Sequence, residues 1–176
     1  PEHPTVATSL EFLGSLHLEA GDPARARDEF RDCLYIRQLA FGDEHPDVAL
    51  ARSERDGALR VTGDLDGARK QLQLALPALE AGFTELHPNV ARAYLESARV
   101  EEAGGAYTDA FDLALEAERR SREHLHLASG ALPERLALRY AAERVSGRDL
   151  LVSLAERVNS DDMVRAGWNS VIRSRA

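Results

Sequence analysis

The sequence is poor in cysteine and aromatic residues: one cysteine occurs among 176 residues, and aromatics make up 6%. The single thiol, Cys33, cannot form a disulfide within the chain, which excludes a disulfide scaffold and favours a reducing compartment. We therefore expect a cytoplasmic location. β-branched and aromatic side chains, which strands prefer, are too scarce for a β-sandwich. No apolar run approaches the roughly 20 residues that span a bilayer, so no membrane partner is expected.

The chain also has no initiator methionine and no signal peptide, because Pro1-Glu2-His3-Pro4 has neither a basic start nor an apolar stretch. We expect it to be a fragment of a longer protein. A net charge of −8 makes a phosphate backbone an unfavourable partner, so nucleic-acid binding is not expected. By contrast, 28 alanines and 25 leucines are present. A composition of this kind predicts an all-α fold.

The dipeptide His-Pro occurs three times at a constant spacing of 42 residues, beginning at His3, His45 and His87. Apolar, small and glycine residues recur at the same spacing without gaps. These aligned sets are Val6, Val48 and Val90; Ala7, Ala49 and Ala91; Gly21, Gly63 and Gly105; Ala26, Ala68 and Ala110; and Cys33, Ala75 and Ala117. A fixed period of this length is typical of a helical array.

Each repeat predicts two antiparallel helices. Proline suits the first position of the first helix, and the shared glycine suits the end of that helix. Asp22 and Asp64 stand near the start of the second helix, where an acidic side chain favours the helix dipole. Ala26, Phe30 and Cys33 then fall on one face. We expect a right-handed α-solenoid of three helix pairs over residues 3–128.

The first repeat resembles the tetratricopeptide repeat (TPR). The residues that match its pattern are Leu10, Leu13-Gly14, His17, Ala26 and Phe30. The common period of that family is about 34 residues, and the 42-residue version that begins at His-Pro is similar to the kinesin-light-chain type. The resemblance covers residues 3–128. It implies a surface of stacked helix pairs that binds a protein or peptide.

Residues 129–176 follow a different pattern, because a fourth His-Pro is absent at Ser129-Gly130. Apolar spacing and caps predict about three further helices, which start near Pro133, Asp149 and Ser160. Three strings after TPR-like repeats resemble the connector that precedes a caspase-like CHAT domain in bacterial proteins: residues 132–140, 146–150 and 168–176. The resemblance implies that residues 129–176 form a helical connector or cap, and that a CHAT-like peptidase domain follows in the parent protein.

No set of residues predicts catalysis, a metal or a cofactor in this fragment. Cys33 falls in the small inward column, which favours a packed core thiol over a nucleophile. The three histidines before proline are interpreted as helix caps rather than metal ligands. Other candidates have simpler structural explanations: His124 and His126 as solvated, Gly104-Gly105 as the repeat turn, Asp161-Asp162 as a cap, Trp168 as core, and Arg119, Arg120 and Arg122 as a solvated basic face.

The function predicted from the sequence is a protein–protein interaction scaffold without enzymatic activity. The helix phase places nine candidate partner-binding residues on the concave face: Thr8, Glu11, Ser15, Leu18, Ser53, Arg60, Arg92, Leu95 and Arg99. The alternative is a purely structural or self-associating array with no separate ligand. A weaker third possibility is an independent hydrolase. Self-association is predicted through the last helix, whose apolar face carries Trp168, Val171 and Ile172.

Overall fold

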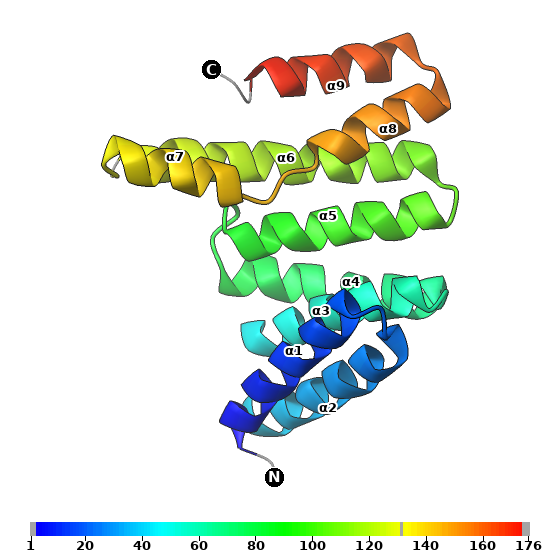
Figure 1. The fold of residues 1–176 in the computed structure, drawn as a ribbon, viewed down its shortest axis with the longest axis vertical. Helices are drawn as coiled ribbons and strands as arrows, with labels where there is room; N and C mark the ends of the chain where they lie inside the picture. Colours follow the sequence, from blue (N-terminus) through cyan, green and yellow to red (C-terminus); the bar gives the residue numbers. More distant parts are fainter. Residues whose placement is uncertain (1–2, 131, 174–176) are drawn as a thin grey trace. The chain divides into compact units, whose positions relative to one another are not determined.

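The computed structural model describes residues 3–130 and 132–173, and these form nine helices and no strand (Figure 1). None of these helices combines the length and apolar character that crossing a bilayer requires. The helices are α1 (Pro4–Glu19), α2 (Pro23–Phe41), α3 (Pro46–Val61), α4 (Leu65–Gly82), α5 (Pro88–Ala103), α6 (Tyr107–Ser129), α7 (Glu134–Glu143), α8 (Arg148–Val158) and α9 (Asp161–Arg173).

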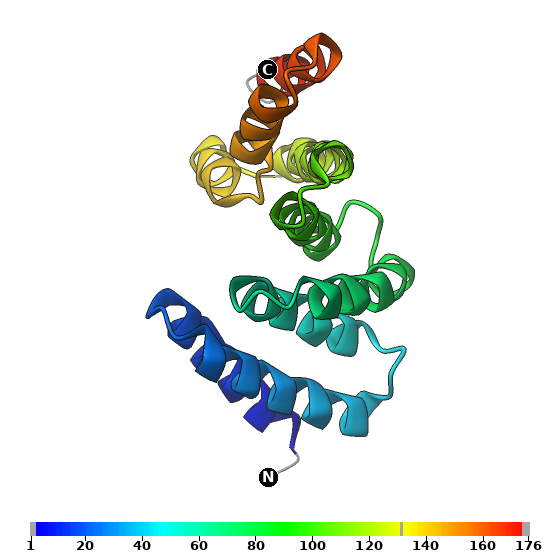
Figure 2. The same ribbon diagram turned by 90° about the vertical axis from the view of Figure 1, so that its right-hand side faces the viewer.

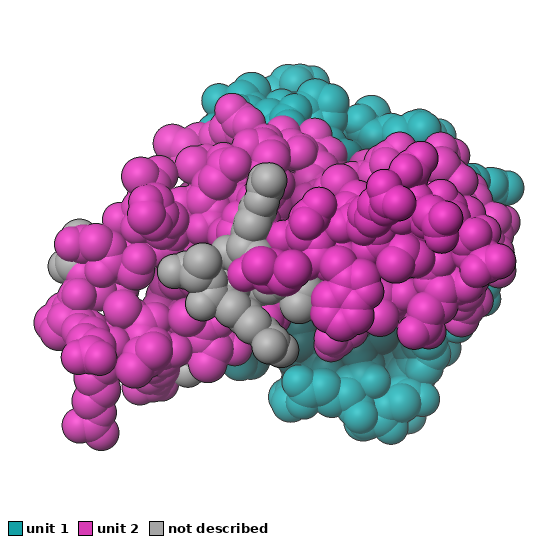
Figure 3. Space-filling view, turned by 90° about the horizontal axis from the view of Figure 1, so that it is seen from above, with its two compact units in different colours: residues 1–83 teal, residues 84–176 magenta. Residues whose placement is uncertain are grey.

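The chain divides into two compact units, Pro1–Phe83 and Thr84–Ala176, which are coloured teal and magenta in Figure 3. Unit 1 contains α1 to α4, and unit 2 contains α5 to α9. This division by packing falls inside the repeat region, whereas the repeat period places the expected boundary at residues 128 and 129. The domain boundaries inferred from the repeats stay a prediction.

The histidine of each His-Pro pair caps the helix that follows it. The Nδ1 atoms of His3, His45 and His87 accept hydrogen bonds from the backbone N–H two residues later, at 3.3, 3.1 and 3.2 Å. Proline occupies the first turn in each case, where its missing N–H costs nothing. The predicted capping role of the three histidines is confirmed.

The shared glycines follow α1, α3 and α5 and have left-handed backbones, with φ of 76° at Gly21, 83° at Gly63 and 82° at Gly105. Residues with a Cβ rarely adopt this conformation, so glycine ends the helix at the least cost. Asp22 and Asp64 then cap α2 and α4 by accepting from the N–H groups of Arg25 and Gly67. The 42-residue markers therefore encode the boundaries of the helix pairs.

The core of unit 1 lies where α2 packs between α1 and α3. One cluster joins Ala7 and Leu10 of α1, Cys33, Leu34 and Ile36 of α2, and Val48 and Ala51 of α3. A second cluster joins Ala26 and Phe30 to Ala58, with Leu18 packed against it. Figure 2 shows α1 and α2 in blue as an antiparallel pair. A Cβ on Gly14 would lie 2.8 Å from the Phe30 ring, so this helix pair needs a glycine there.

The core of unit 2 centres on α6, which is covered by α5 on one side and by α8 and α9 elsewhere. Its buried residues are Ala98, Ala110, Phe111, Ala114, Leu151, Leu154 and Ala155. The three C-terminal helices expected from the sequence are present as α7, α8 and α9. No residue of α7 whose side chain is described is buried, so α7 contributes little to this core.

Candidate functional site

The outer face of α1 exposes a strip of large apolar side chains. Phe12 is 71% exposed, Leu16 55% and Leu13 45%. These three side chains line a shallow groove together with the smaller polar side chains of Thr5, Thr8 and Ser9. Exposed apolar patches of this kind mark interaction surfaces in folded proteins. The groove is therefore the strongest candidate binding surface in unit 1.

The 42-residue spacing allows the exposed face of α1 to be compared with the equivalent face of α3 in unit 1. Val48 and Ala58 of α3 occupy the positions of Val6 and Leu16 in α1, and both are fully buried against residues of α2. Val6 and Leu16, by contrast, are 37% and 55% exposed. The face of α3 that α2 covers is thus open in α1. In α3 the equivalent surface accommodates a helix.

The predicted partner-binding residues of α1 differ in their surroundings. Thr8 and Ser15 are exposed, and Thr8 lines the groove. Glu11 is half-buried and forms an ion pair with Arg37 of α2. Leu18 is half-buried and packs against the cluster of Ala26, Phe30 and Ala58. Thr8 and Ser15 are therefore the α1 members that a partner can reach directly.

The predicted residues of α3 and α5 are less accessible. Ser53 is 4% exposed and Leu95 is 5% exposed, so a partner cannot reach either without displacing its neighbours. Arg60 is half-buried, and its Nε atom has no hydrogen-bond partner among the described residues. Arg92 and Arg99 are half-buried, and Arg99 pairs with Glu96 one turn earlier. Thr8 and Ser15 are exposed, whereas helix phase could not predict what covers Ser53 and Leu95. The assignment of these residues to a partner-binding face stays a prediction.

The only cysteine is a core residue. Cys33 is fully buried, and burial raises the pKa of its thiol to about 11, although the nearby Arg37 guanidinium opposes the shift. At neutral pH the side chain is therefore an uncharged thiol, which is a weak nucleophile. The packed-core interpretation of Cys33 is confirmed.

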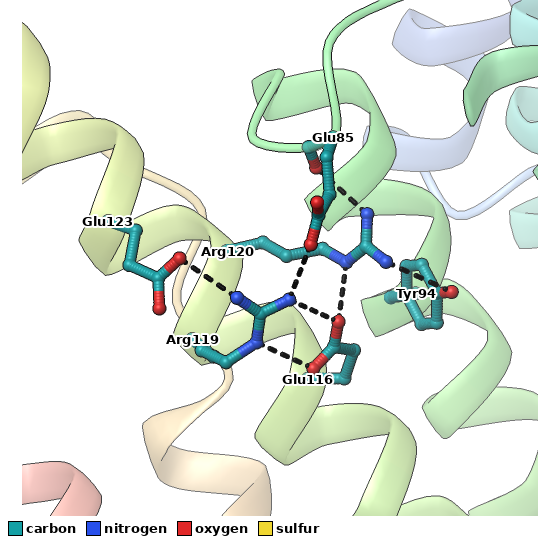
Figure 4. A network of polar contacts seen from close by, with 6 residues as sticks. All are labelled: Glu85, Tyr94, Glu116, Arg119, Arg120 and Glu123. Atoms are coloured by element: carbon teal, nitrogen blue, oxygen red, sulfur yellow. Dashed lines mark hydrogen bonds and ion pairs between the residues drawn. The ribbon is translucent and has the colours of Figure 1, made fainter. Parts of the chain in front are cut away.

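Two of the three arginines predicted to form a solvated basic face are bound into a polar network (Figure 4). Arg119 donates to Glu116, Glu85 and Glu123, at 2.7–2.9 Å. Arg120 is 7% exposed, donates to Glu116 at 2.7 Å and lies over the Tyr94 ring. Hydrogen bonds from Arg119 hold the pKa of Glu116 at about 2. The solvated-face prediction is wrong for Arg120, because carboxylates and an aromatic ring of its own unit surround it.

A buried ion pair, missed by the sequence reasoning, joins α6 to the segment before α8. Glu118 is fully buried, and Arg144 donates to it at 2.6 Å. The Ser146 hydroxyl and the Gly147 N–H also donate to this carboxylate, at 3.3 and 3.2 Å. One signal was available in the repeat register. Glu118 falls in a column that holds leucine in the first two repeats, at Leu34 and Leu76.

The remaining candidates are distributed without forming a site. Trp168 is 60% exposed, so its interpretation as a core residue is wrong. Ile172 is 62% exposed, and the Val171 side chain lies outside the described residues. The Ser160 hydroxyl accepts from the Met163 N–H at the start of α9. His124 is half-buried beside the Tyr140 ring. Across the part of the chain that is described, no three His, Cys, Asp or Glu residues are grouped to hold a metal ion.

Comparison with known proteins connects this geometry to one repeat family. The tetratricopeptide repeat family matches residues 6–47. One similar solved structure contains nearly identical TPR-like repeats named for a kinesin light chain of Podosopora anserina. It superposes with a TM-score of 0.61 at 16% sequence identity, and the match covers 99% of this chain and 96% of that chain. A single-residue variant of that protein superposes with a TM-score of 0.59 at 16% sequence identity, and the match covers 98% of this chain and 94% of that chain. No curated protein matches the sequence.

These likenesses agree with the helix pairs described above. The expected fold class is confirmed: the chain is all-α and its fold is that of TPR-like α-solenoids. Residues 6–47 match a tetratricopeptide repeat, and the chain as a whole has the fold of TPR-like repeat proteins.

Proposed function

We propose that this chain is a protein-interaction module, and that the groove on α1 binds a helix of a partner protein. The observation that carries the proposal is the exposure of Phe12, Leu13 and Leu16 on one face of α1. The equivalent face of α3 is buried by α2. An open copy of a surface that elsewhere receives a helix supports the binding of a helix here as well.

The sequence of the groove also indicates the chemistry of its partner. Where α3 has the charged residues Arg52, Glu54 and Arg55, the register gives α1 the apolar residues Leu10, Phe12 and Leu13. Two of these charges have partners in α3, since Arg52 pairs with Asp43 and Glu54 lies 4.0 Å from Arg37. A partner of α1 meets no such charges. The groove therefore favours an amphipathic helix whose contact face is wholly apolar.

The second part of the proposal concerns polar residues on the first helix of each repeat. Thr8 and Ser15 present hydroxyl groups beside the apolar strip, and Thr8 also lines the groove. Three arginines in this set are half-buried, each within its own unit: Arg60 of α3, and Arg92 and Arg99 of α5. Hydroxyl and guanidinium groups at such positions fix the orientation of a bound segment more than they add affinity.

A displayed library of helical peptides tests the proposal. We expect selection to enrich peptides with leucine or aromatic residues at helical spacing. Their affinity should fall at least tenfold, or about 1.4 kcal/mol, in a Phe12→Ser, Leu16→Ser variant. The matched control is Leu127→Ser, which changes an equally exposed leucine on α6. Selected peptides that bind the double variant as tightly as the unaltered chain would refute the groove. A library that yields no binder would favour the purely structural array.

We further propose that residues 129–176 act as the connector to a CHAT-like peptidase domain, and that partner binding to the repeats regulates that domain. The support is the three strings at 132–140, 146–150 and 168–176, which resemble such connectors. The parent reading frame beyond Ala176 is the direct test. A domain there with a histidine and cysteine dyad would support the proposal, and any other downstream sequence would end it.

A further inference from the structure

A pocket of unit 2 lies between α6 and α9. It encloses about 280 Å³ and is lined by Leu115, Arg119, Arg122, Ala166, Asn169 and Ser170. Leu115 and Ala166 also pack against the core of unit 2, so the apolar wall of the pocket is held in place by the fold. The four polar side chains come from two helices that are far apart in the sequence.

Two polar groups of this pocket lack partners. The Ser170 side chain is only 4% exposed, and its hydroxyl has no hydrogen-bond partner among the described residues. A buried hydroxyl without a partner destabilises the protein, so a ligand that supplies a hydrogen-bond partner gains affinity. Arg122 is half-buried, and within the described chain none of its guanidinium N–H groups is matched by an acceptor.

The neighbouring charges determine what Arg122 can receive. Arg119 and Arg120 are shared among Glu85, Glu116 and Glu123, so these five groups sum to −1 (Figure 4). Adding Arg122 brings the local charge to zero. A dianion such as a phosphate group would be repelled by the three carboxylates without a matching excess of positive charge. A single carboxylate fits the two parallel N–H groups of one arginine.

We propose that this pocket binds a glutamate or aspartate side chain of a protein partner. The Arg122 guanidinium donates to the carboxylate, and the Ser170 hydroxyl and Asn169 amide complete its hydrogen bonds. The aliphatic stem of the bound side chain packs on Leu115 and Ala166. This assignment rests on the proposed protein-interaction function and adds an acidic anchor point on unit 2.

Short peptides test the assignment on the full chain by NMR. The probes are acetylated and amidated Ala-Glu-Ala, with Ala-Gln-Ala and Ala-phosphoserine-Ala for comparison. We expect Ala-Glu-Ala to shift the Asn169 and Ser170 amide signals and the Arg122 Nε–H signal in a saturable way. The glutamine peptide should bind at least tenfold more weakly, because it lacks the charge that strengthens the arginine hydrogen bonds.

Matched variants separate the pocket from general charge effects. Arg122→Gln should weaken Ala-Glu-Ala binding about tenfold, whereas Arg165→Gln, an exposed arginine of α9 outside the pocket, should leave it unchanged. Ser170→Ala removes the buried hydroxyl with little change in shape, and it should weaken binding about threefold to tenfold.

Three results would overturn the proposal: no saturable shift, equal binding of the glutamine peptide, or tighter binding of the phosphoserine peptide. Unchanged affinity in Ser170→Ala would also overturn the proposal, because the buried hydroxyl without a partner is the group that the ligand is expected to satisfy. Failure here is distinguishable from failure of the α1 proposal. The α1 groove is reported by the amide signals of Thr8 and Leu16, which belong to the other unit.

Discussion

Removal of Arg144 is expected to destabilise unit 2 far more than a surface substitution would. The Arg144 side chain is 6% exposed and donates to the fully buried Glu118. Arg144→Ala leaves that carboxylate with two weaker donors, the Ser146 hydroxyl and the Gly147 N–H. Breaking a buried ion pair by removing one partner costs about 3–5 kcal/mol, and the two remaining donors place the expected loss near the lower figure.

The same pair predicts that a second substitution rescues the first. Glu118→Leu places leucine in the column that already holds Leu34 and Leu76. In the Arg144→Ala background this change removes the buried charge, so we expect it to recover about 2 kcal/mol or more. Because Leu34 is itself a buried core residue, the column has room for an apolar side chain of this size.

Urea unfolding followed by circular dichroism gives the free energies of the wild type, both single variants and the double variant. Arg135→Ala, an exposed arginine of α7, is the matched control and should change stability by less than about 0.5 kcal/mol. A loss below about 1 kcal/mol in Arg144→Ala, or a double variant less stable than both single variants, would refute the reasoning. Amide exchange in α6 would show whether the loss is confined to unit 2.

Three further predictions follow from local geometry. Gly14→Ala should cost about 1–3 kcal/mol in urea unfolding, because its Cβ would lie 2.8 Å from Phe30, whereas Gly57→Ala, 3.9 Å from its nearest neighbour, should stabilise α3 by up to about 1 kcal/mol. Glu116 has a pKa of about 2 in the fold, so its stabilising effect over Glu116→Gln should be complete above its ordinary pKa of 4.5 and vanish as pH falls toward 2; a constant difference from pH 6 to 2 would contradict this. Cys33, with a pKa of about 11, should react with a thiol reagent at pH 8 only at the rate of unfolding, and fast labelling of the native chain would contradict its burial.

The helix boundaries were predictable because each is encoded by residues within one turn of it. His-Pro and the shared glycine fix the ends of the first helices through the backbone, without help from distant parts of the chain. The core column that contains Cys33 was predictable for a related reason. Small residues repeat there at a period that only stacked helix pairs explain.

The surface was harder to predict, because exposure depends on which element covers a given face. Helix phase placed Ser53 and Leu95 on the first-helix face, but it carries no information about neighbouring helices, and both are buried. Arg120 and Trp168 were misjudged in opposite directions for the same reason. An arginine beside acidic and aromatic neighbours can be buried, and the tryptophan of α9 lies exposed on the last described helix.

The lack of buried side chains in α7 has a consequence for how unit 2 opens. Unfolding α7 exposes almost no core surface, so the helix can lose its backbone hydrogen bonds while α5, α6, α8 and α9 stay folded. The hydrogen-bonded segment of Arg144, Ser146 and Gly147 marks where that opening stops. We therefore expect limited proteolysis of unit 2 to begin at peptide bonds between Glu134 and Ala142, and the remaining helices to keep their packing after the cut.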